Sequence, residues 1–361
     1  MKVTVILGTR PEIIKFSPVI EELEREDIDY FVIHSGQHYS PNMDKVFFHQ
    51  LSLPSPKYSI NVGSGTHGES TGKMLIGIEK ILINEKPDTV LVQGDTNTTL
   101  AGALSAVKLL IKVGHIEAGL RSFNKEMPEE INRVMIDHIS DYLFVPTDNA
   151  KRNLLREGIE RDKIFVTGNT IVDAIIRNLK LASKTEVLEK YGLKKEKYFL
   201  VTIHRQENVD RPKRFSNILK GLTMISEEFN LPIVYPIHPR AKKRMREYNL
   251  KPTKNIRLLD PIDYLSFLRL EKSAKLVLSD SGGVQEEACI LKVPCVTLRY
   301  DTERPETLKV GANILAGTEP KDILEKTKIM LGRKRNWSNP FGDGKTSKRI
   351  IRILKEKYLN H

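Results

Sequence analysis

Short β-branched segments alternate with longer helical patterns along almost the whole chain. Twelve of these segments are predicted strands, from VTVILG at the N-terminus to ANILAG near residue 315. Most are continuous apolar runs, which is typical of parallel strands covered by helices on both faces. The alternation therefore predicts the α/β class with right-handed crossovers. Because twelve strands exceed one comfortable open sheet, we expect two doubly wound sheets.

This alternation is interrupted between residues 168 and 197 by a helix and a charged, loop-like stretch. We place a domain boundary there, with one Rossmann-like domain over residues 1–168 and a second over 169–344. The last helix, 345–361, is expected to return to the first domain. A length of 361 residues suits two domains with a core each. Two such sheets facing one another are expected to enclose a central cleft.

Composition excludes several classes of protein. No apolar run reaches the roughly 20 residues that span a membrane, so no membrane partner is expected. The N-terminal apolar run ends at Gly8, too early for a signal peptide, which favours a cytoplasmic protein. Cys289 and Cys295 fit no metal or disulfide spacing and are expected to be buried thiols. The net charge of +12 suits an anionic ligand, but the basic runs lack interleaved aromatics, which argues against nucleic acid.

The segment LVLSDSGGVQEEA, residues 276–288, runs from an apolar strand through small residues into a helix. Gly282 and Gly283 allow backbone N–H groups to approach a ligand, and the helix directs its positive end toward an anion. An ordinary turn with Ser281 as N-cap is the alternative, but a second glycine adds nothing to a cap. Glu287 lies about one turn into the helix and suits ribose hydroxyls. The segment predicts a nucleoside diphosphate site.

Carboxylates follow two neighbouring apolar strands. Asp95 comes after VLVQG and Glu117 after VGHI, so both are expected at one edge of the first sheet. Neighbouring acids raise one another's pKa and suit proton transfer. Glu129 and Glu130 in MPEEINR can join these acids. Alternatively, they lie at the N-terminus of a helix and complement its dipole, which is the expected role of one of the two. No histidine pair has ligand spacing, so no metal site is expected.

Cationic and imidazole side chains also lie at predicted strand ends. Arg10 and Lys15 follow the first strand and are interpreted as partners of a diphosphate, with a plain solvated turn as the alternative. His204 and His238 end corresponding strands of the second half and are interpreted as hydrogen-bond donors to the same group. Arg304 can add a bidentate phosphate contact.

A glycine-rich segment, NVGSGTHGEST, contains G-x-G-x-x-G at Gly63, Gly65 and Gly68. A dinucleotide fingerprint belongs after the first strand of its unit, where this chain has GTRPE instead. Glu69 stands where a phosphate loop requires lysine, which reverses the charge facing the phosphates. We therefore expect a mobile glycine-rich loop over the cleft.

Taken in order, GTRPE, SGQH, VQGDT, HIEAGLRS, PEEINR, DSGGVQEEA and TERPE resemble the non-hydrolysing UDP-N-acetylglucosamine 2-epimerases. The resemblance implies a glycosyltransferase-B fold and interconversion of UDP-N-acetylglucosamine and UDP-N-acetylmannosamine for polysaccharide biosynthesis, with no cofactor and no metal. It also implies a homodimer. Bacterial members bind a second substrate molecule as activator, near the stretch after His38 and around His238.

The resemblance also implies which residues contact the UDP-sugar. These are Arg10, Lys15, Asp95, Glu117, His204, Ile262, Phe267, Ser281, Gly282, Gly283, Glu287 and Arg304. Relatives often carry glutamine at Ile262, so a contact there uses the backbone. Asp95, Glu117 and Glu130 match the acids implicated in catalysis, and His204 helps to stabilise the departing diphosphate.

The implied chemistry begins with departure of UDP, which makes the C2 hydrogen acidic. Removal of that proton gives a glycal, and reprotonation from the other face requires a second carboxylate. Four alternatives remain open: a UDP-sugar glycosyltransferase of the same fold, a hydrolysing 2-epimerase, a non-catalytic nucleotide-sugar sensor, and an NAD enzyme that uses GSGTHG. The inward carboxylates argue against the transferase, and the misplaced fingerprint argues against the NAD enzyme.

Overall fold

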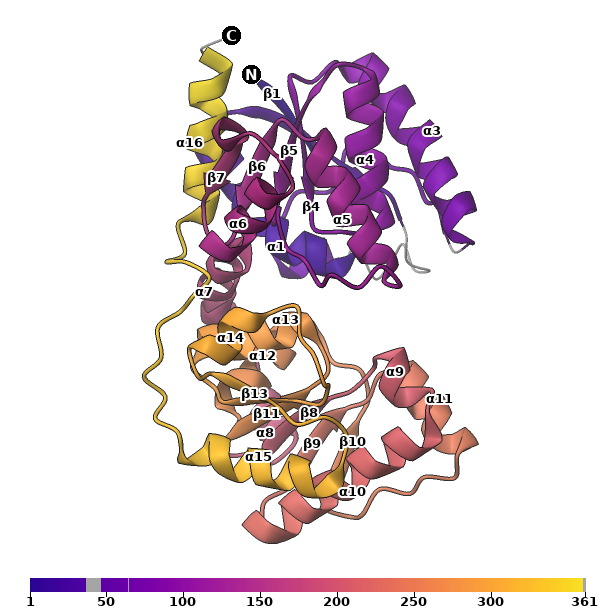
Figure 1. The fold of residues 1–361 in the computed structure, drawn as a ribbon, viewed down its shortest axis with the longest axis vertical. Coiled ribbons are helices and arrows are strands. Elements are labelled where there is room, and N and C mark those ends of the chain that lie inside the picture. The colour runs from indigo at the N-terminus through magenta and orange to yellow at the C-terminus, as the bar shows by residue number, and fades with distance from the viewer. Residues whose placement is uncertain (37–46, 64, 360–361) are drawn as a thin grey trace. The chain divides into compact units, whose positions relative to one another are not determined.

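The computed structural model describes residues 1–36, 47–63 and 65–359. The chain divides into two compact units (Figure 1), one formed by Met1–Ile176 with Phe341–His361 and the other by Arg177–Pro340. We call them the first and second unit. Both contain a parallel sheet between helices, which confirms the predicted α/β class.

The first unit contains, in its described residues, a seven-stranded sheet of order β3-β2-β1-β4-β5-β6-β7. Its strands are β1 (Lys2–Leu7), β2 (Asp29–His34), β3 (Tyr58–Ser59), β4 (Thr89–Gln93), β5 (Lys112–Ile116), β6 (Tyr142–Val145) and β7 (Ile164–Val166). Its helices are α1 (Arg10–Arg25), α3 (His67–Glu85), α4 (Asn97–Lys108), α5 (Pro128–Ile139), α6 (Asp148–Arg156), the 3-10 turn η1 (Arg161–Lys163) and α16 (Thr346–Leu359), while α7 (Thr170–Ala182) continues into the second unit.

The sheet of the first unit places the ends of β4 and β5 side by side at its centre. β1 pairs in parallel with both β2 and β4, and β4 pairs with β5. The central strands are buried on both faces, as their unbroken apolar pattern predicts. At the C-terminus, α16 packs on α1, where Lys355 Nζ lies 3.0 Å from Glu26 Oε2.

The second unit has, in its described residues, a six-stranded parallel sheet of order β10-β9-β8-β11-β12-β13. Its strands are β8 (Phe199–Thr202), β9 (Ile233–Pro236), β10 (Ile256–Leu259), β11 (Leu276–Ser279), β12 (Cys295–Thr297) and β13 (Asn313–Leu315). Its helices are α8 (Val187–Lys190), α9 (Gln206–Val209), α10 (Pro212–Phe229), α11 (Pro239–Glu247), α12 (Tyr264–Ser273), α13 (Gly282–Leu291), α14 (Pro305–Lys309) and α15 (Pro320–Gly332).

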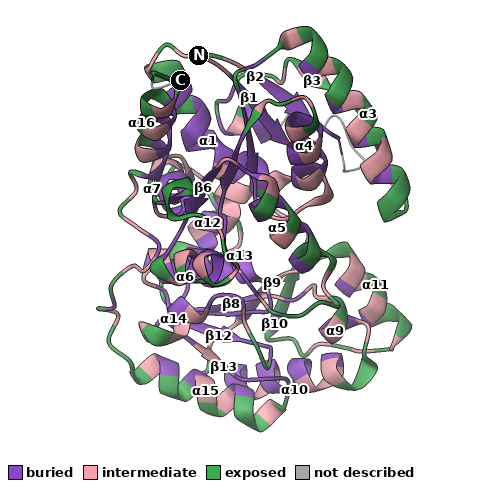
Figure 2. Ribbon diagram, turned by 45° about the horizontal axis from the view of Figure 1, so that its top comes forward, coloured by how far each residue is buried: buried purple, intermediate pink, exposed green. Residues whose placement is uncertain are grey.

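Each unit has its own apolar core. Figure 2 shows that the central strands of each sheet are buried and that the covering helices are exposed mainly on their outer sides. In the second unit, Phe199, Phe215 and Tyr235 are fully buried between the sheet and its helices. Cys289 and Cys295 are buried free thiols, as predicted. No described helix is long and apolar enough to cross a membrane.

All twelve predicted strands are present, and the structure adds one more. β3 (Tyr58–Ser59) pairs only with β2 and forms the edge of the first sheet. The sequence analysis missed this strand because two residues carry no readable periodicity.

The prediction of a glycine-rich loop is wrong from His67 onward. α3 begins there, so Gly68 lies in its first turn. Thr66 caps the helix in a capping box, in which its hydroxyl accepts from the Glu69 N–H at 3.3 Å and Glu69 accepts from the Thr66 N–H at 2.9 Å. Glu69 therefore caps a helix, and the four-residue spacing typical of this motif was the signal. Ser64 lies outside the described residues.

Candidate active site

Two adjacent strands of the first unit carry carboxylates to one edge of its sheet. Gln93 at the end of β4 pairs with Ile116 at the end of β5. Asp95 follows β4 after Gly94, and Glu117 follows β5 directly. The backbone has positive φ at both turns, 73° at Gly94 and 72° at Glu117. A glutamate with a left-handed backbone conformation is uncommon and persists only where the surrounding structure stabilises it.

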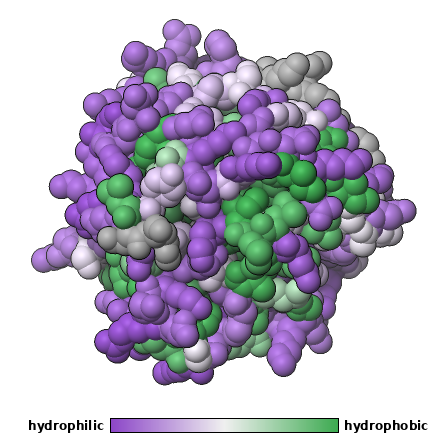
Figure 3. Space-filling model, turned by 90° about the horizontal axis from the view of Figure 1, so that it is seen from above, coloured by the Kyte–Doolittle hydropathy of each residue, from purple (hydrophilic) through white to green (hydrophobic). Residues whose placement is uncertain are grey.

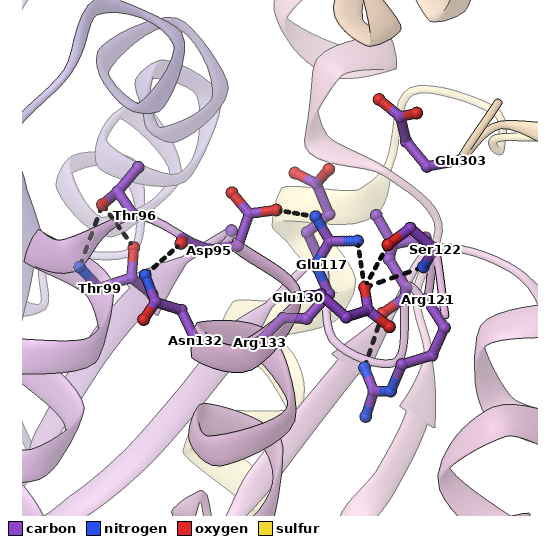
Figure 4. Close-up of polar contacts among 12 residues, drawn as sticks. Asp95, Thr96, Thr99, Glu117, Arg121, Ser122, Glu130, Asn132, Arg133 and Glu303 are labelled. Atoms are coloured by element: carbon purple, nitrogen blue, oxygen red, sulfur yellow. Dashed lines mark hydrogen bonds and ion pairs between the residues drawn. The ribbon is translucent and has the colours of Figure 1, made fainter. Parts of the chain in front are cut away.

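Arg133 joins two of the predicted acids (Figure 4). Its Nη1 lies 3.0 Å from Glu130 Oε2, and its Nη2 pairs with Asp95. Glu130 also accepts hydrogen bonds of 2.9 Å from the Ser122 N–H, the Ser122 hydroxyl and the Phe123 N–H. Four donors therefore fix the Glu130 carboxylate. The sequence analysis missed Arg133, although its position three residues after Glu130 on a helix was a usable signal.

Burial separates the two neighbouring glutamates of α5. Glu130 is 4% exposed and belongs to the cluster just described. Glu129 is exposed in the first helical turn, where a negative charge complements the helix dipole. The sequence left open which glutamate has the helix-terminal role, and the structure assigns it to Glu129.

Glu117 has a cationic partner in its own unit. Lys15 Nζ, from α1, lies 2.5 Å from Glu117 Oε2, and both side chains are largely buried. Lys15 was predicted to accompany a diphosphate, and here it holds a carboxylate. The other predicted cation, Arg10, has its guanidinium carbon 6.0 Å from the centroid of the Phe47 ring.

A buried ionic network lies behind the two acid-bearing turns. His115 Nε2 lies 2.8 Å from the Gly94 carbonyl oxygen and its Nδ1 lies 2.7 Å from Asp137 Oδ1. Asp137 also accepts from the Gly119 N–H at 3.1 Å and pairs with Arg121 at 2.7 Å. Burial raises the pKa of Asp137, but the charges of His115 and Arg121 outweigh it and hold that pKa below its usual range. One carboxylate thus ties both turns together.

Glu12, the last residue of GTRPE, links the turn after β1 to the turn after β4, the neighbouring strand in the sheet. Its carboxylate accepts from the Gly8 and Thr9 N–H groups at 2.9 and 2.7 Å and from the Thr96 hydroxyl at 2.7 Å. Burial raises its pKa above the usual value. The sequence analysis did not single out Glu12, although Thr9-x-x-Glu12 is a capping box.

The second unit contains a pocket of about 250 Å³ at the ends of its central strands. Five residues singled out from the sequence line it, namely His204, His238, Ile262, Phe267 and Ser281. Most of the other lining residues are apolar or proline, including Ile203, Pro236 and Val284. Gly282, Gly283, Glu287 and Arg304 belong to α13 and the start of α14 and do not line it.

A buried aspartate fixes the backbone of the turn that follows β8 and carries His204. Asp280, which is fully buried, accepts from the backbone N–H groups of His204 and Arg205 at 3.1 Å. The His204 Nδ1 lies 3.3 Å from Asp280 Oδ1, and its ring centroid lies 5.9 Å from that of His238. Burial and the charges of His204 and Arg240 lower the pKa of His238.

The two glycines that begin α13 differ in their surroundings. A Cβ added at Gly282 would lie 2.5 Å from Glu303 Oε1. A Cβ added at Gly283 would meet nothing closer than Ser281 Oγ at 4.0 Å. Ser281 is the N-cap residue but makes no side-chain cap hydrogen bond. A side chain at Gly282 would therefore displace the Glu303 carboxylate, whereas nothing in the second unit fills the space beside Gly283.

Arginines and glutamates form a buried ionic group after β12. Arg304, predicted to contact phosphate, has its Nε 2.7 Å from Glu286 Oε1 on α13. Glu303 pairs with Arg205 at 2.9 Å and with Arg299 at 2.8 Å. Burial raises the pKa of Glu303, but the charges of Arg304, Arg299 and Arg205 lower it to about 2.

Glu303→Gln is expected to destabilise the protein by about 3 kcal/mol near neutral pH. A carboxylate with a depressed folded-state pKa stabilises the fold above its usual value of 4.5, and this contribution is lost as the pH falls toward about 2. Chemical denaturation at several pH values measures the effect. The difference in the free energy of unfolding between wild type and Glu303→Gln should become smaller at acid pH. A difference that does not depend on pH would contradict the depressed pKa of Glu303.

Within the described residues, no cluster of three or more His, Cys, Asp or Glu side chains is arranged to hold a metal ion. The first unit brings together Asp95, Glu117 and Glu130 with Lys15 and Arg133. The second unit combines a pocket with a helix N-terminus. Gln37 and His38, and most of the stretch that follows them, lie outside the described residues.

These features define a class of protein: a two-domain α/β chain of the glycosyltransferase-B type, with carboxylates in one unit and a helix N-terminus beside a pocket in the other. A family model described as UDP-N-acetylglucosamine 2-epimerase matches residues 21–355. The chain belongs to this family, which confirms the predicted resemblance.

Named relatives match over nearly the full length. The UDP-N-acetylglucosamine 2-epimerase of Methanocaldococcus jannaschii is 61% identical over 98% of this chain and 99% of its own. That of Methanococcus maripaludis is 56% identical over 98% of each chain. A crystal structure of the M. jannaschii enzyme in complex with UDP-GlcNAc and UDP has a TM-score of 0.91 and 61% identity, covering 99% of this chain and all of the other.

Proposed function

We propose that this protein interconverts UDP-N-acetylglucosamine and UDP-N-acetylmannosamine by inverting the configuration at C2. The observation that carries the proposal is the placement of Asp95 and Glu117 at the exits of two paired strands, together with Glu130 of α5 and the cations that keep these acids in place. Membership of the family and the solved complex of a relative with UDP-GlcNAc and UDP support the choice of substrate.

The proposed reaction proceeds by elimination and re-addition. The bond between C1 and the UDP oxygen breaks, and its electron pair leaves with UDP. The C2 proton passes to a carboxylate, and the electrons of the C2–H bond form a C1–C2 double bond, giving a glycal. A second carboxylic acid then protonates C2 from the opposite face while the UDP oxygen adds again at C1. Atoms and charge balance without any oxidant or cofactor.

The surroundings of the three acids suggest different roles. Glu130 is fixed by four donors, so its carboxylate oxygens are already engaged. Its role in the proposal is to position Arg133. Asp95 pairs with Arg133 and Glu117 pairs with Lys15, and these two acids are the candidates for the two proton transfers.

The proposal assigns UDP to the second unit, with Arg10 and Lys15 as further cations. The N-terminus of α13 offers unpaired N–H groups and a positive dipole to the departing diphosphate. His204 lies in the adjacent pocket with Ile262, Phe267 and Ser281, and Arg304 is next to the same helix. Glu287, one turn along α13, receives the ribose hydroxyls.

Gly283→Ala is expected to lower the affinity for UDP about tenfold or more, because its methyl group occupies the space through which the diphosphate approaches the helix. Stability should not fall, since alanine favours a helix over glycine by about 1 kcal/mol. Calorimetric titration with UDP and thermal unfolding measure the two effects. The matched variant Gly282→Ala should instead lose stability by displacing Glu303. Unchanged UDP binding in folded Gly283→Ala would contradict the anion site.

Incubation with UDP-N-acetylglucosamine, followed by NMR of the products, tests the proposed function. The proposal predicts UDP-N-acetylmannosamine and no free sugar. Free N-acetylmannosamine would indicate a hydrolysing 2-epimerase. Transfer of the sugar to an added acceptor would indicate a glycosyltransferase, and binding without turnover would indicate a sensor.

We also propose that the protein is a homodimer joined through α3 and α5. Ile76 and Ile83 of α3 and Ile131 and Met135 of α5 are 46% to 59% exposed, and each pair recurs at helical spacing on one face. Figure 3 shows that apolar side chains form exposed areas on a face that is otherwise largely hydrophilic. Ile131→Lys should shift the sedimentation coefficient from dimer to monomer, whereas Ile329→Lys on α15 should not.

A further inference from the structure

Phe123 combines two unfavourable features in the segment between β5 and α5. Its backbone has a positive φ of 59°, and the residue is 73% exposed. A left-handed conformation is uncommon for a bulky residue, and an exposed phenyl ring leaves a large apolar surface in water. Strained residues of this kind cluster at functional sites, so a functional role is the expected reason for Phe123.

Leu110 shows that the same two features can have an ordinary cause. It is 92% exposed and also has a φ of 59°. It follows the C-cap residue of α4, where chains commonly turn left-handed to end a helix. Phe123 lies outside any helix, between Ile116, where β5 ends, and Pro128, where α5 begins. The end of a helix therefore does not explain Phe123.

Hydrogen bonds fix the backbone on both sides of Phe123. The Phe123 N–H donates to Glu130 Oε1 at 2.9 Å, and the N–H and hydroxyl of Ser122 donate to Oε2 of the same carboxylate at 2.9 Å. The Asn124 carbonyl oxygen accepts from the Met127 N–H at 3.1 Å, which closes the turn that follows. The left-handed conformation is thus imposed by specific contacts.

These contacts make Phe123 part of the acid cluster of the candidate active site. Glu130, which accepts from the Phe123 N–H, pairs with Arg133 at 3.0 Å. Arg133 in turn pairs with Asp95, a candidate for proton transfer at C2. Figure 4 shows Glu130 joined to both Ser122 and Arg133. An exposed aromatic residue is therefore held directly by the group of acids that is proposed to act at C2.

The chemistry of the substrate indicates what this ring can contact. The acetamido group is attached to C2, the same carbon whose proton these acids exchange. Only a nitrogen and a carbonyl carbon separate its methyl group from C2, so the methyl group must lie close to the acids. It is an apolar group on a sugar whose other substituents carry hydroxyl or phosphate groups. An aromatic ring suits such a methyl group by apolar contact.

We propose that Phe123 is a specificity-determining residue whose ring packs against the acetamido methyl group of the UDP-sugar. This inference rests on the proposed function and deepens it, because it names a group that the first unit recognises besides the C2 hydrogen. Binding of the substrate removes the exposed ring from water, which offsets the cost of holding it at the surface.

Phe123→Ala removes the ring but keeps a side chain at the left-handed position. This variant should bind UDP-N-acetylglucosamine roughly tenfold more weakly, the usual scale of a lost apolar contact, while its affinity for UDP is unchanged. UDP-glucose, which has a hydroxyl group at C2, should bind equally well to both proteins, so the preference for the acetamido sugar falls. Phe123→Tyr keeps the ring and should retain the preference. Calorimetric titration measures these affinities.

Leu110→Gly is the matched control, because Leu110 is an exposed left-handed residue that precedes β5, whereas Phe123 follows it. Leu110→Gly and Phe123→Gly should both be at least as stable as wild type in thermal unfolding, since glycine adopts a positive φ without strain. The preference for the acetamido sugar should fall in Phe123→Gly and stay unchanged in Leu110→Gly.

Saturation-transfer NMR detects the proposed contact itself. In wild type, the acetamido methyl signal of UDP-N-acetylglucosamine should receive strong transfer from the protein. In Phe123→Ala this signal should weaken relative to the signals of the uracil protons. Equal transfer to the methyl group in both proteins would contradict the proposed contact.

The outcomes keep this inference and the proposed function apart. If wild type neither binds nor converts UDP-N-acetylglucosamine, the proposed function fails and the inference fails with it. If wild type converts the sugar but folded Phe123→Ala keeps the full preference, only the inference is wrong. Slower turnover at saturating substrate with an unchanged preference would mean that Phe123 acts only through Glu130, which would also overturn the inference.

Discussion

Glu117→Gln is expected to lower the rate of C2 proton exchange in UDP-N-acetylglucosamine by about 10²–10⁴-fold, the usual contribution of a general acid or base. The amide cannot take up or deliver the proton, although it keeps the size of the side chain. Asp95→Asn should have an effect of similar size. UDP affinity should change little in both, because the proposal has these two carboxylates act on the sugar and assigns the binding of UDP to other residues.

Glu129→Gln is the matched control, since Glu129 neighbours Glu130 on α5 but is exposed. It should leave the exchange rate unchanged. Glu130→Gln should slow exchange through Arg133, which loses one of its two carboxylate partners. If all three single variants, Asp95→Asn, Glu117→Gln and Glu130→Gln, exchanged the C2 proton at the wild-type rate, the assignment of these carboxylates to proton transfer would be wrong.

Asp137→Ala should destabilise the protein by about 3–5 kcal/mol, the usual loss when one partner of a buried ion pair is removed. The substitution leaves His115 and Arg121 without their shared carboxylate and releases the Gly119 N–H. Denaturant unfolding near neutral pH measures the loss. Because the pKa of Asp137 is depressed, its contribution should be present above the usual 3.8 and should fade at lower pH.

Asp162→Ala provides the comparison for this prediction, because Asp162 is an exposed residue of η1 in the same unit. It should change the free energy of unfolding by less than about 0.5 kcal/mol. An Asp137→Ala variant that is as stable as Asp162→Ala would show that the network behind the acid turns does not hold them.

The fold could be predicted from the sequence because its strands are continuous apolar runs. VTVILG and TVLVQGD are central in the first sheet, buried on both faces, and need no partner to be recognised. β3 could not be predicted, because only pairing with β2 defines its two residues as a strand. The glycine spacing predicted a loop at Gly68, but the capping box of Thr66 and Glu69 starts a helix there.

The candidate site was predictable where chemistry coincides with a strand end. Asp95 and Glu117 follow β4 and β5 within two residues, so their position in the chain indicates their position in space. Arg133 and Asp137 were missed because their roles depend on partners distant in the sequence. Glu129 and Glu130 differ in burial, and the sequence cannot show this difference because the two residues are identical and adjacent.

The central claim is that carboxylates of the first unit exchange the C2 proton of a UDP-sugar. Incubation of the protein with UDP-N-acetylglucosamine in deuterated water, with the C2 position followed by NMR, tests it most directly. The account predicts that deuterium appears at C2 of both UDP-N-acetylglucosamine and UDP-N-acetylmannosamine, and that Glu117→Gln suppresses its appearance. Formation of UDP-N-acetylmannosamine that keeps its original hydrogen at C2 would contradict it.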